Sequence, residues 1–157
     1  MGCLYIRCNL SNIIVQSAEV IVDFHTHILP PSFNHHREEY LARDATFCAL
    51  FSNPRTRMAT ADELVEAMDQ AHVDIAVVMG PGWADWATAR EANDYILESV
   101  SLYPSRLVGL CSVNPVWGDD AVREVERCAS AGIRGIGELH PNTQGFDIGV
   151  KEAMAAV

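Results

Sequence analysis

Two histidines separated by a single residue carry the clearest chemical signal in the sequence. His25 and His27 close an apolar run that covers residues 19–29, and such a run predicts a buried strand. Because alternate residues of a strand point to the same side, the two imidazoles project together, about 7 Å apart along the strand. Imidazole nitrogens are good ligands for zinc and related divalent ions. The motif predicts a metal site; the alternative is a pair of strand-end histidines that bind no metal.

Glu138 and His140 repeat this spacing at the end of another apolar run, residues 133–140. A carboxylate inside an apolar strand is costly unless it is paired or bound to a metal ion. Glu138 is therefore a candidate third metal ligand and a candidate catalytic base. The alternative is a carboxylate that is solvated or paired with Arg134.

Three residues at strand ends are candidate substrate contacts. His140 shares a side with Glu138, and Asn114 ends the run at residues 106–114, where its amide could hydrogen-bond a substrate. Trp83 follows a Gly-Pro-Gly turn and could form the apolar wall of a pocket. For Trp83, covering the end of the sheet is an equally good interpretation.

Four apolar runs must position these side chains: residues 19–29, 74–80, 106–114 and 133–140. Each is nearly continuous rather than alternating, which is typical of parallel strands buried on both faces. Helical patterns separate the runs, and this order predicts an α/β fold with a parallel sheet covered by helices. Residues 30–59 interrupt the rhythm as a long insertion, with one short helix expected near residues 38–50.

The helical segments carry recognisable ends. Thr60 and Glu63 have capping-box spacing. A second helix is expected to end at Pro104. Asp119 or Asp120 is expected to cap a third helix, which should stop before Gly132. Residues 148–157 look like the start of a fourth helix.

Length and composition limit the possible classes of protein. The chain has 157 residues, of which 49% are apolar and 20% are charged, as in soluble globular proteins. No apolar run reaches the length of about 18 residues that a membrane helix needs. The net charge of −10 disfavours nucleic acids and anionic membranes as partners. Five cysteines without a C-x-x-C motif and the lack of a convincing targeting signal favour a cytoplasmic protein with reduced thiols.

The motifs together resemble the amidohydrolase superfamily, in particular its amidohydrolase-related branch, which also contains metal-dependent decarboxylases. Residues 21–27 resemble the first strand of that family and residues 132–138 its fourth. The likeness implies a TIM-barrel-like fold with about four of the eight (β/α) units, a partial barrel, because a complete barrel needs about 250 residues. We expect residues 1–18 to form an N-terminal extension, a candidate disordered segment, and residues 19–157 the amino-terminal half of the barrel.

The resemblance also implies a metal site and its chemistry. His25 and His27 would bind one divalent ion, with zinc expected, and Glu138 matches a position where some members place a glutamate ligand. Other members carry a carboxylated lysine there or no ligand. The histidines of strands five and six and the aspartate of strand eight have no counterpart in this sequence.

Several functions remain open at this point. The first is a metal-dependent hydrolase that acts on a C–N or ester-like bond of a small molecule; a decarboxylase of the same family is the alternative. A histidinol-phosphatase-like phosphoesterase would need further metal-binding histidines that are not found. A non-catalytic half-barrel is the fourth possibility, and its open sheet edges would pair with another chain or form a homo-oligomer.

Overall fold

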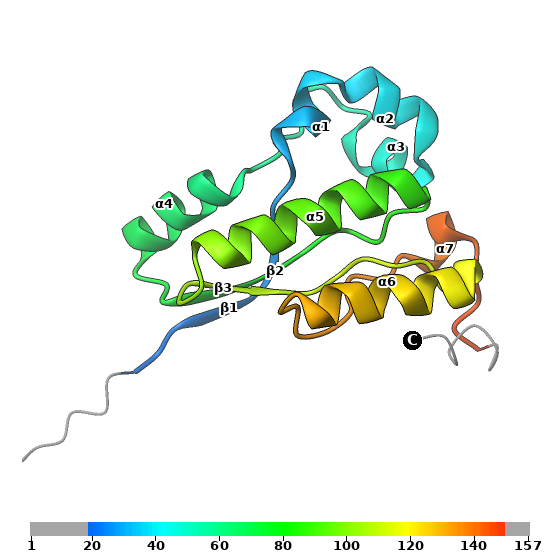
Figure 1. The fold of residues 1–157 in the computed structure, drawn as a ribbon. Helices are drawn as coiled ribbons and strands as arrows, with labels where there is room; N and C mark the ends of the chain where they lie inside the picture. The colour runs from blue at the N-terminus through cyan, green and yellow to red at the C-terminus, as the bar shows by residue number, and fades with distance from the viewer. Residues whose placement is uncertain (1–18, 150–157) are drawn as a thin grey trace, which may run out of the picture.

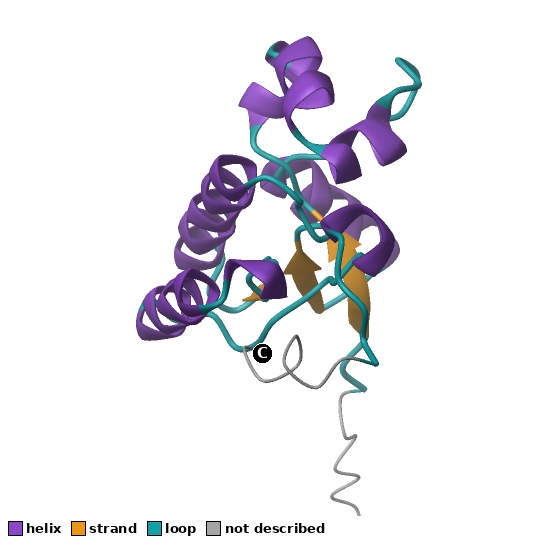
Figure 2. Ribbon diagram, turned by 90° about the vertical axis from the view of Figure 1, so that its right-hand side faces the viewer, coloured by secondary structure: helices purple, strands orange, loops and turns teal. Residues whose placement is uncertain are grey.

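The computed structural model describes residues 19–149 and shows a short parallel sheet with helices packed along one face (Figures 1 and 2). The strands are β1 (Val22–His27), β2 (Ile75–Met79) and β3 (Leu107–Gly109), and their order in the sheet is the order in the chain. This is the α/β fold that the alternating pattern predicts, and it is consistent with the partial barrel that the family resemblance implies. The proposed extension at residues 1–18 lies outside the described residues.

Strand pairing places the ends of β1 and β2 side by side. His27 pairs with Met79, and Val78 pairs with Gly109 of β3. The carboxyl ends of the strands therefore meet at one edge, which is where active sites of parallel sheets form.

The predicted fourth strand at residues 133–140 is wrong as a regular strand. This segment runs parallel to the extension of β3 but forms only one bridge, between Cys111 and Ile136. The amides of Arg134 and Gly137 donate to the carbonyls of Gly109 and Cys111 at 2.9 and 3.0 Å. Among the described residues no strand pairs with the side of this segment that faces away from β3. The segment also contains Gly135 and Gly137, and glycine weakens a strand, so pairing stops after a single bridge.

Helices α4 (Ala61–Ala71), α5 (Trp86–Leu102) and α6 (Asp119–Ser130) cover the outer face of the sheet. They bury one continuous core against β2 and β3 through residues that include Met68, Ile96 and Cys128. Long apolar stripes at helical spacing thus hold the sheet from one side.

The ends of the helices follow local rules. The capping box of α4 is confirmed, because the Glu63 amide donates to Thr60 Oγ1 and the Thr60 amide donates to Glu63 Oε2. Gly132 follows α6 with a φ of 107°, as a residue after a helix end often does. The prediction that Asp119 or Asp120 caps α6 is wrong: Gly118 is the N-cap, and both aspartates lie in the first turn, where the helix dipole favours them.

The insertion at residues 30–59 is more ordered than the single helix expected. It forms α1 (Pro31–His35), α2 (Arg37–Arg43) and α3 (Ala45–Phe51). Aromatic residues from all three helices pack around Trp83 in a second apolar core: Phe33, Tyr40, Phe47 and Phe51. Each short helix buries at least one aromatic ring there, and this burial explains why three helices form instead of one.

Two short helices complete the described chain: η1 (Pro115–Trp117) and α7 (Pro141–Gln144). The sequence pattern does not predict α7, and most of the expected helix at residues 148–157 lies outside the described residues. No helix in residues 19–149 is both long and apolar enough to cross a bilayer.

Candidate metal centre

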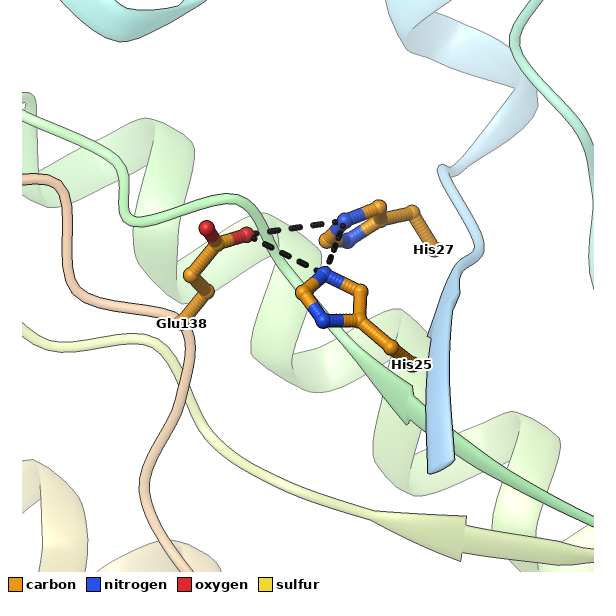
Figure 3. Close-up of side chains that lie close together, drawn as sticks. All are labelled: His25, His27 and Glu138. Atoms are coloured by element: carbon orange, nitrogen blue, oxygen red, sulfur yellow. Dashed lines mark hydrogen bonds and ion pairs between the residues drawn. The ribbon is translucent and has the colours of Figure 1, made fainter. Parts of the chain in front are cut away.

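The carboxyl ends of β1 and β2 and the segment after Ile136 bring three polar side chains together. His25 and His27 come from β1, and Glu138 reaches them because its amide donates to the carbonyl of Gly80, just beyond β2, at 2.9 Å. Figure 3 shows the two imidazoles and the carboxylate directed toward one another. The H-x-H spacing puts the two histidines on one side of the strand, and the tertiary fold adds the carboxylate.

The three potential ligand atoms are evenly spaced. The Nε2 atoms of His25 and His27 lie 3.1 Å apart, and each lies 3.5 Å from Glu138 Oε2. Metal–nitrogen bonds of about 2.0–2.1 Å in a tetrahedron separate neighbouring ligand atoms by about 3.3 Å. The observed separations therefore match one shared divalent ion.

A hydrogen bond from the second ring nitrogen of His27 orients the imidazole for metal binding. Its Nδ1 lies 3.0 Å from the carbonyl oxygen of Met79. A carbonyl only accepts, so Nδ1 carries a proton, and Nε2 is the ring nitrogen that can supply a lone pair to a metal ion in the cluster. Metal-binding histidines are commonly oriented by such a bond to the second nitrogen.

Nothing else in the described part of the chain satisfies the carboxylate of Glu138. No side-chain or main-chain N–H there donates to it, and its partners in the cluster are the two Nε2 atoms. A carboxylate that faces a lone pair at this distance needs a cation or a proton between them. The donor set therefore fits a divalent ion held by His25, His27 and Glu138, and partial exposure of all three side chains leaves room for further ligands.

A cavity of about 330 Å³ opens beside this cluster. His27, Glu138 and His140 line one part of it, and apolar side chains that include Leu29, Phe51 and Met58 line another. Most of the apolar wall comes from the insertion. The sequence predicts a long insertion here but does not single out Phe51, Met58 or Arg57, because nothing in the local pattern distinguishes a residue that lines a pocket from one in the core.

The three candidate substrate contacts have different surroundings. His140 lines the cavity. The Trp83 side chain is fully buried in the second apolar core, and Asn114 is 2% exposed. Asn114 Nδ2 donates to the backbone carbonyl of Gln144, and Asn114 Oδ1 accepts from the backbone amide of Val116. In this structure Trp83 and Asn114 hold the strand-end loops in place, and His140 is the candidate that faces the cavity.

Comparison with protein families agrees with this architecture. The family model described as Amidohydrolase matches residues 22–152, and the chain belongs to this family. No curated protein matches the chain.

Solved structures show the same fold. A 5-carboxyvanillate decarboxylase from Novosphingobium aromaticivorans, complexed with manganese and a nitrobenzoic acid, is 19% identical, with a TM-score of 0.69 over 90% of this chain and 48% of that chain. The 5-carboxyvanillate decarboxylase of Sphingomonas paucimobilis is 18% identical, with a TM-score of 0.68 over 87% of this chain and 48% of that chain. An amidohydrolase II is 22% identical, with a TM-score of 0.66 over 87% and 45%. The chain thus spans about half the length of these structures.

Proposed function

We propose that the chain supplies the metal-binding part of a barrel enzyme that removes carbon dioxide from an aromatic acid. The observation that carries this proposal is the convergence of His25, His27 and Glu138 beside a largely apolar cavity. Decarboxylation replaces hydrolysis as the first candidate because an apolar wall suits an aromatic ring, and because similar structures are decarboxylases.

The cavity offers complementary groups to such a substrate. Leu29, Phe51 and Met58 can pack against a flat ring. Arg57 also lines the cavity, its side chain is 92% exposed, and its ion pair with Glu63 is long, at 4.0 Å. A guanidinium held this loosely is available to a substrate carboxylate.

A divalent ion at the three ligands would supply Lewis-acid polarisation of a substrate oxygen. The residues of the chain perform the other tasks: the apolar wall excludes water, Arg57 orients a carboxylate, and His140 presents its ring to the bound molecule. Zinc is suited to nitrogen ligands, and manganese is present in a similar structure. We therefore propose a divalent ion from this group.

A metal-dependent hydrolase that cleaves a C–N or ester-like bond is the second candidate. The family description favours it, as does the exposure of the cluster to water, which hydrolysis consumes. Either reaction would draw on groups from the part of the barrel that the similar structures contain and this chain does not span.

Pairing with another polypeptide through the sheet edge is a related proposal. In the described part of the chain β1 pairs only with β2, and Phe24 on this strand is 74% exposed. A free edge with an exposed aromatic residue invites pairing. Light scattering would detect a homo-oligomer, and a well-folded monomer at high protein concentration would argue against it.

Metal binding and product detection test the proposed function together. Chelator-treated wild type and the double variant His25→Ala/His27→Ala are titrated with Mn²⁺ and Zn²⁺ by calorimetry. His36→Ala, which removes an exposed histidine from the insertion, is the matched control. We expect one equivalent of metal in wild type and control, and none in the double variant. Equal binding by all three proteins would refute the ligand assignment.

The reaction type is then read from metal-loaded protein. Release of carbon dioxide from hydroxylated benzoic acids would support the decarboxylase, whereas cleavage of aryl amides or esters would support the hydrolase. If the metal binds and neither product forms, this chain alone does not catalyse either reaction.

A further inference from the structure

A chain of hydrogen bonds connects the insertion with His140. His140 Nδ1 lies 2.9 Å from Thr143 Oγ1, which lies 2.5 Å from Thr46 Oγ1 of α3, and Thr46 Oγ1 lies 2.8 Å from the carbonyl oxygen of Gly82. Thr46 is fully buried, so water does not compete for its hydroxyl. The last group in the chain is a carbonyl, which can only accept.

This fixed end sets the direction of every bond. Each threonine hydroxyl has one hydrogen. Thr46 must donate its hydrogen to the Gly82 carbonyl, and Thr143 must therefore donate its own hydrogen to Thr46. Thr143 has none left for the ring, so the proton between Thr143 and His140 belongs to Nδ1. Any other arrangement puts two lone pairs against each other in at least one of the three contacts.

The backbone around His140 is held independently. Its backbone amide donates to Gln144 Oε1 at 2.7 Å, and Gln144 Nε2 donates to the carbonyls of Trp83 and Val113, both at 3.0 Å. A side chain at Gly82 would come within 2.8 Å of the His140 amide nitrogen. These contacts hold the backbone of His140 in place, and the bond between Nδ1 and Thr143 Oγ1 orients its ring.

We propose that Thr46 and Thr143 are positioning residues that hold His140 in the Nδ1–H tautomer, with Nε2 as a hydrogen-bond acceptor at the cavity. Nε2 has no hydrogen-bond partner within residues 19–149, and the side chain lines the cavity. The ring would then recognise a hydroxyl or another donor on a bound molecule. Recognition of a substrate by His140 rests on the proposed function, whereas the assignment of the tautomer does not depend on it.

Nitrogen NMR of the imidazole rings tests the tautomer directly in metal-free protein without ligand. Spectra are recorded at about pH 9, well above the ordinary histidine pKa of about 6.5, so that the rings are neutral. We expect His140 to show a protonated Nδ1 and an unprotonated Nε2. The opposite pattern in wild type would overturn the proposal.

Two pairs of variants separate positioning from a merely structural role. In Thr46→Val, Thr143 loses its acceptor on α3. Of the two acceptors that remain, His140 Nδ1 at 2.9 Å is nearer than the His140 carbonyl oxygen at 3.3 Å, so Thr143 should donate to Nδ1 and the His140 tautomer should switch to Nε2–H. Thr143→Val removes the partner of Nδ1, so the fixed Nδ1–H pattern should be lost. Thr46→Ser and Thr143→Ser keep the hydroxyls and should restore the wild-type pattern.

His36 signals serve as the internal control; a wild-type pattern in folded Thr46→Val protein would contradict the proposed chain of hydrogen bonds. A failure of metal binding would leave these outcomes unchanged.

Discussion

Glu124 on α6 and Glu138 beside β1 put the same functional group into opposite surroundings. The Glu124 side chain is 2% exposed and contacts Arg127 Nη2 at 2.6 Å, Arg90 Nη1 at 3.5 Å and Asn93 Nδ2 at 3.0 Å. The Glu138 side chain is 36% exposed and faces two imidazole Nε2 atoms at 3.5 Å. One carboxylate is surrounded by donors and the other by groups that can act as metal ligands.

The difference shows how to separate a structural acid from a functional one. Burial alone would raise the pKa of Glu124, but the hydrogen bonds from Arg127 and Asn93 outweigh burial and lower it. The charge of Glu124 is balanced by arginines of the same protein. Glu138 has no such donors among the described residues, so its charge is available to a cation. The two side chains differ in exposure, but the identity of their neighbours decides which carboxylate can bind a cation.

Glu124→Gln should give the largest change. Loss of this charge leaves Arg127 and Arg90 without their buried partner, and we expect the free energy of unfolding to fall by about 3 kcal/mol. Urea denaturation measures this. Glu126→Gln, at an exposed position of the same helix, should change stability by less than about 0.5 kcal/mol. Weakened metal binding in Glu124→Gln, with the fold intact, would remove the contrast between the two acids.

Metal addition should stabilise the chain by a slightly smaller amount. A ligand that binds only the folded state at 100 times its Kd adds about 2.7 kcal/mol. Melting temperatures with and without Mn²⁺ or Zn²⁺ report the effect. It should be present in wild type and Glu126→Gln and absent in His25→Ala/His27→Ala. Equal stabilisation of the double variant would show that the ion binds elsewhere.

Glu138→Gln should leave the metal-free fold nearly unchanged and weaken metal binding. The amide keeps the size of the side chain but removes its charge, and we expect at least about a 10-fold loss of affinity, measured by calorimetry. The free energy of unfolding without metal should stay within about 0.5 kcal/mol of wild type. A large loss of stability in metal-free protein would mean that Glu138, like Glu124, is a structural acid.

The pH dependence of stability should show the smallest effect. The pKa of Glu124 is lower in the folded than in the unfolded chain. Its stabilisation is therefore complete above the ordinary glutamate pKa of about 4.3 and is lost as the pH falls through the lower, folded value. Urea midpoints of metal-free wild type should drop more steeply than those of Glu124→Gln between pH 5 and pH 3. Parallel curves would contradict the assigned role.

Local patterns in the sequence predict much of the framework. The apolar runs locate β1, β2 and β3, and the capping box marks the start of α4. The fourth run fails as a strand because edge pairing depends on a neighbour that the run itself does not encode. The insertion is underestimated because its three helices depend on burial of aromatic residues around Trp83, which lies more than 30 residues from α3 along the chain.

The H-x-H spacing alone predicts that His25 and His27 share one side of a strand, because side-chain direction alternates along a strand with a period of two. Folding of the chain brings Glu138 to them, through the hydrogen bond from its backbone amide to the Gly80 carbonyl, and orients the His27 ring through the Met79 carbonyl. It also decides that Trp83 is core and that His140 faces the cavity. Periodicity is a property of neighbouring residues, whereas burial and hydrogen-bond direction depend on segments that meet only after the chain has folded.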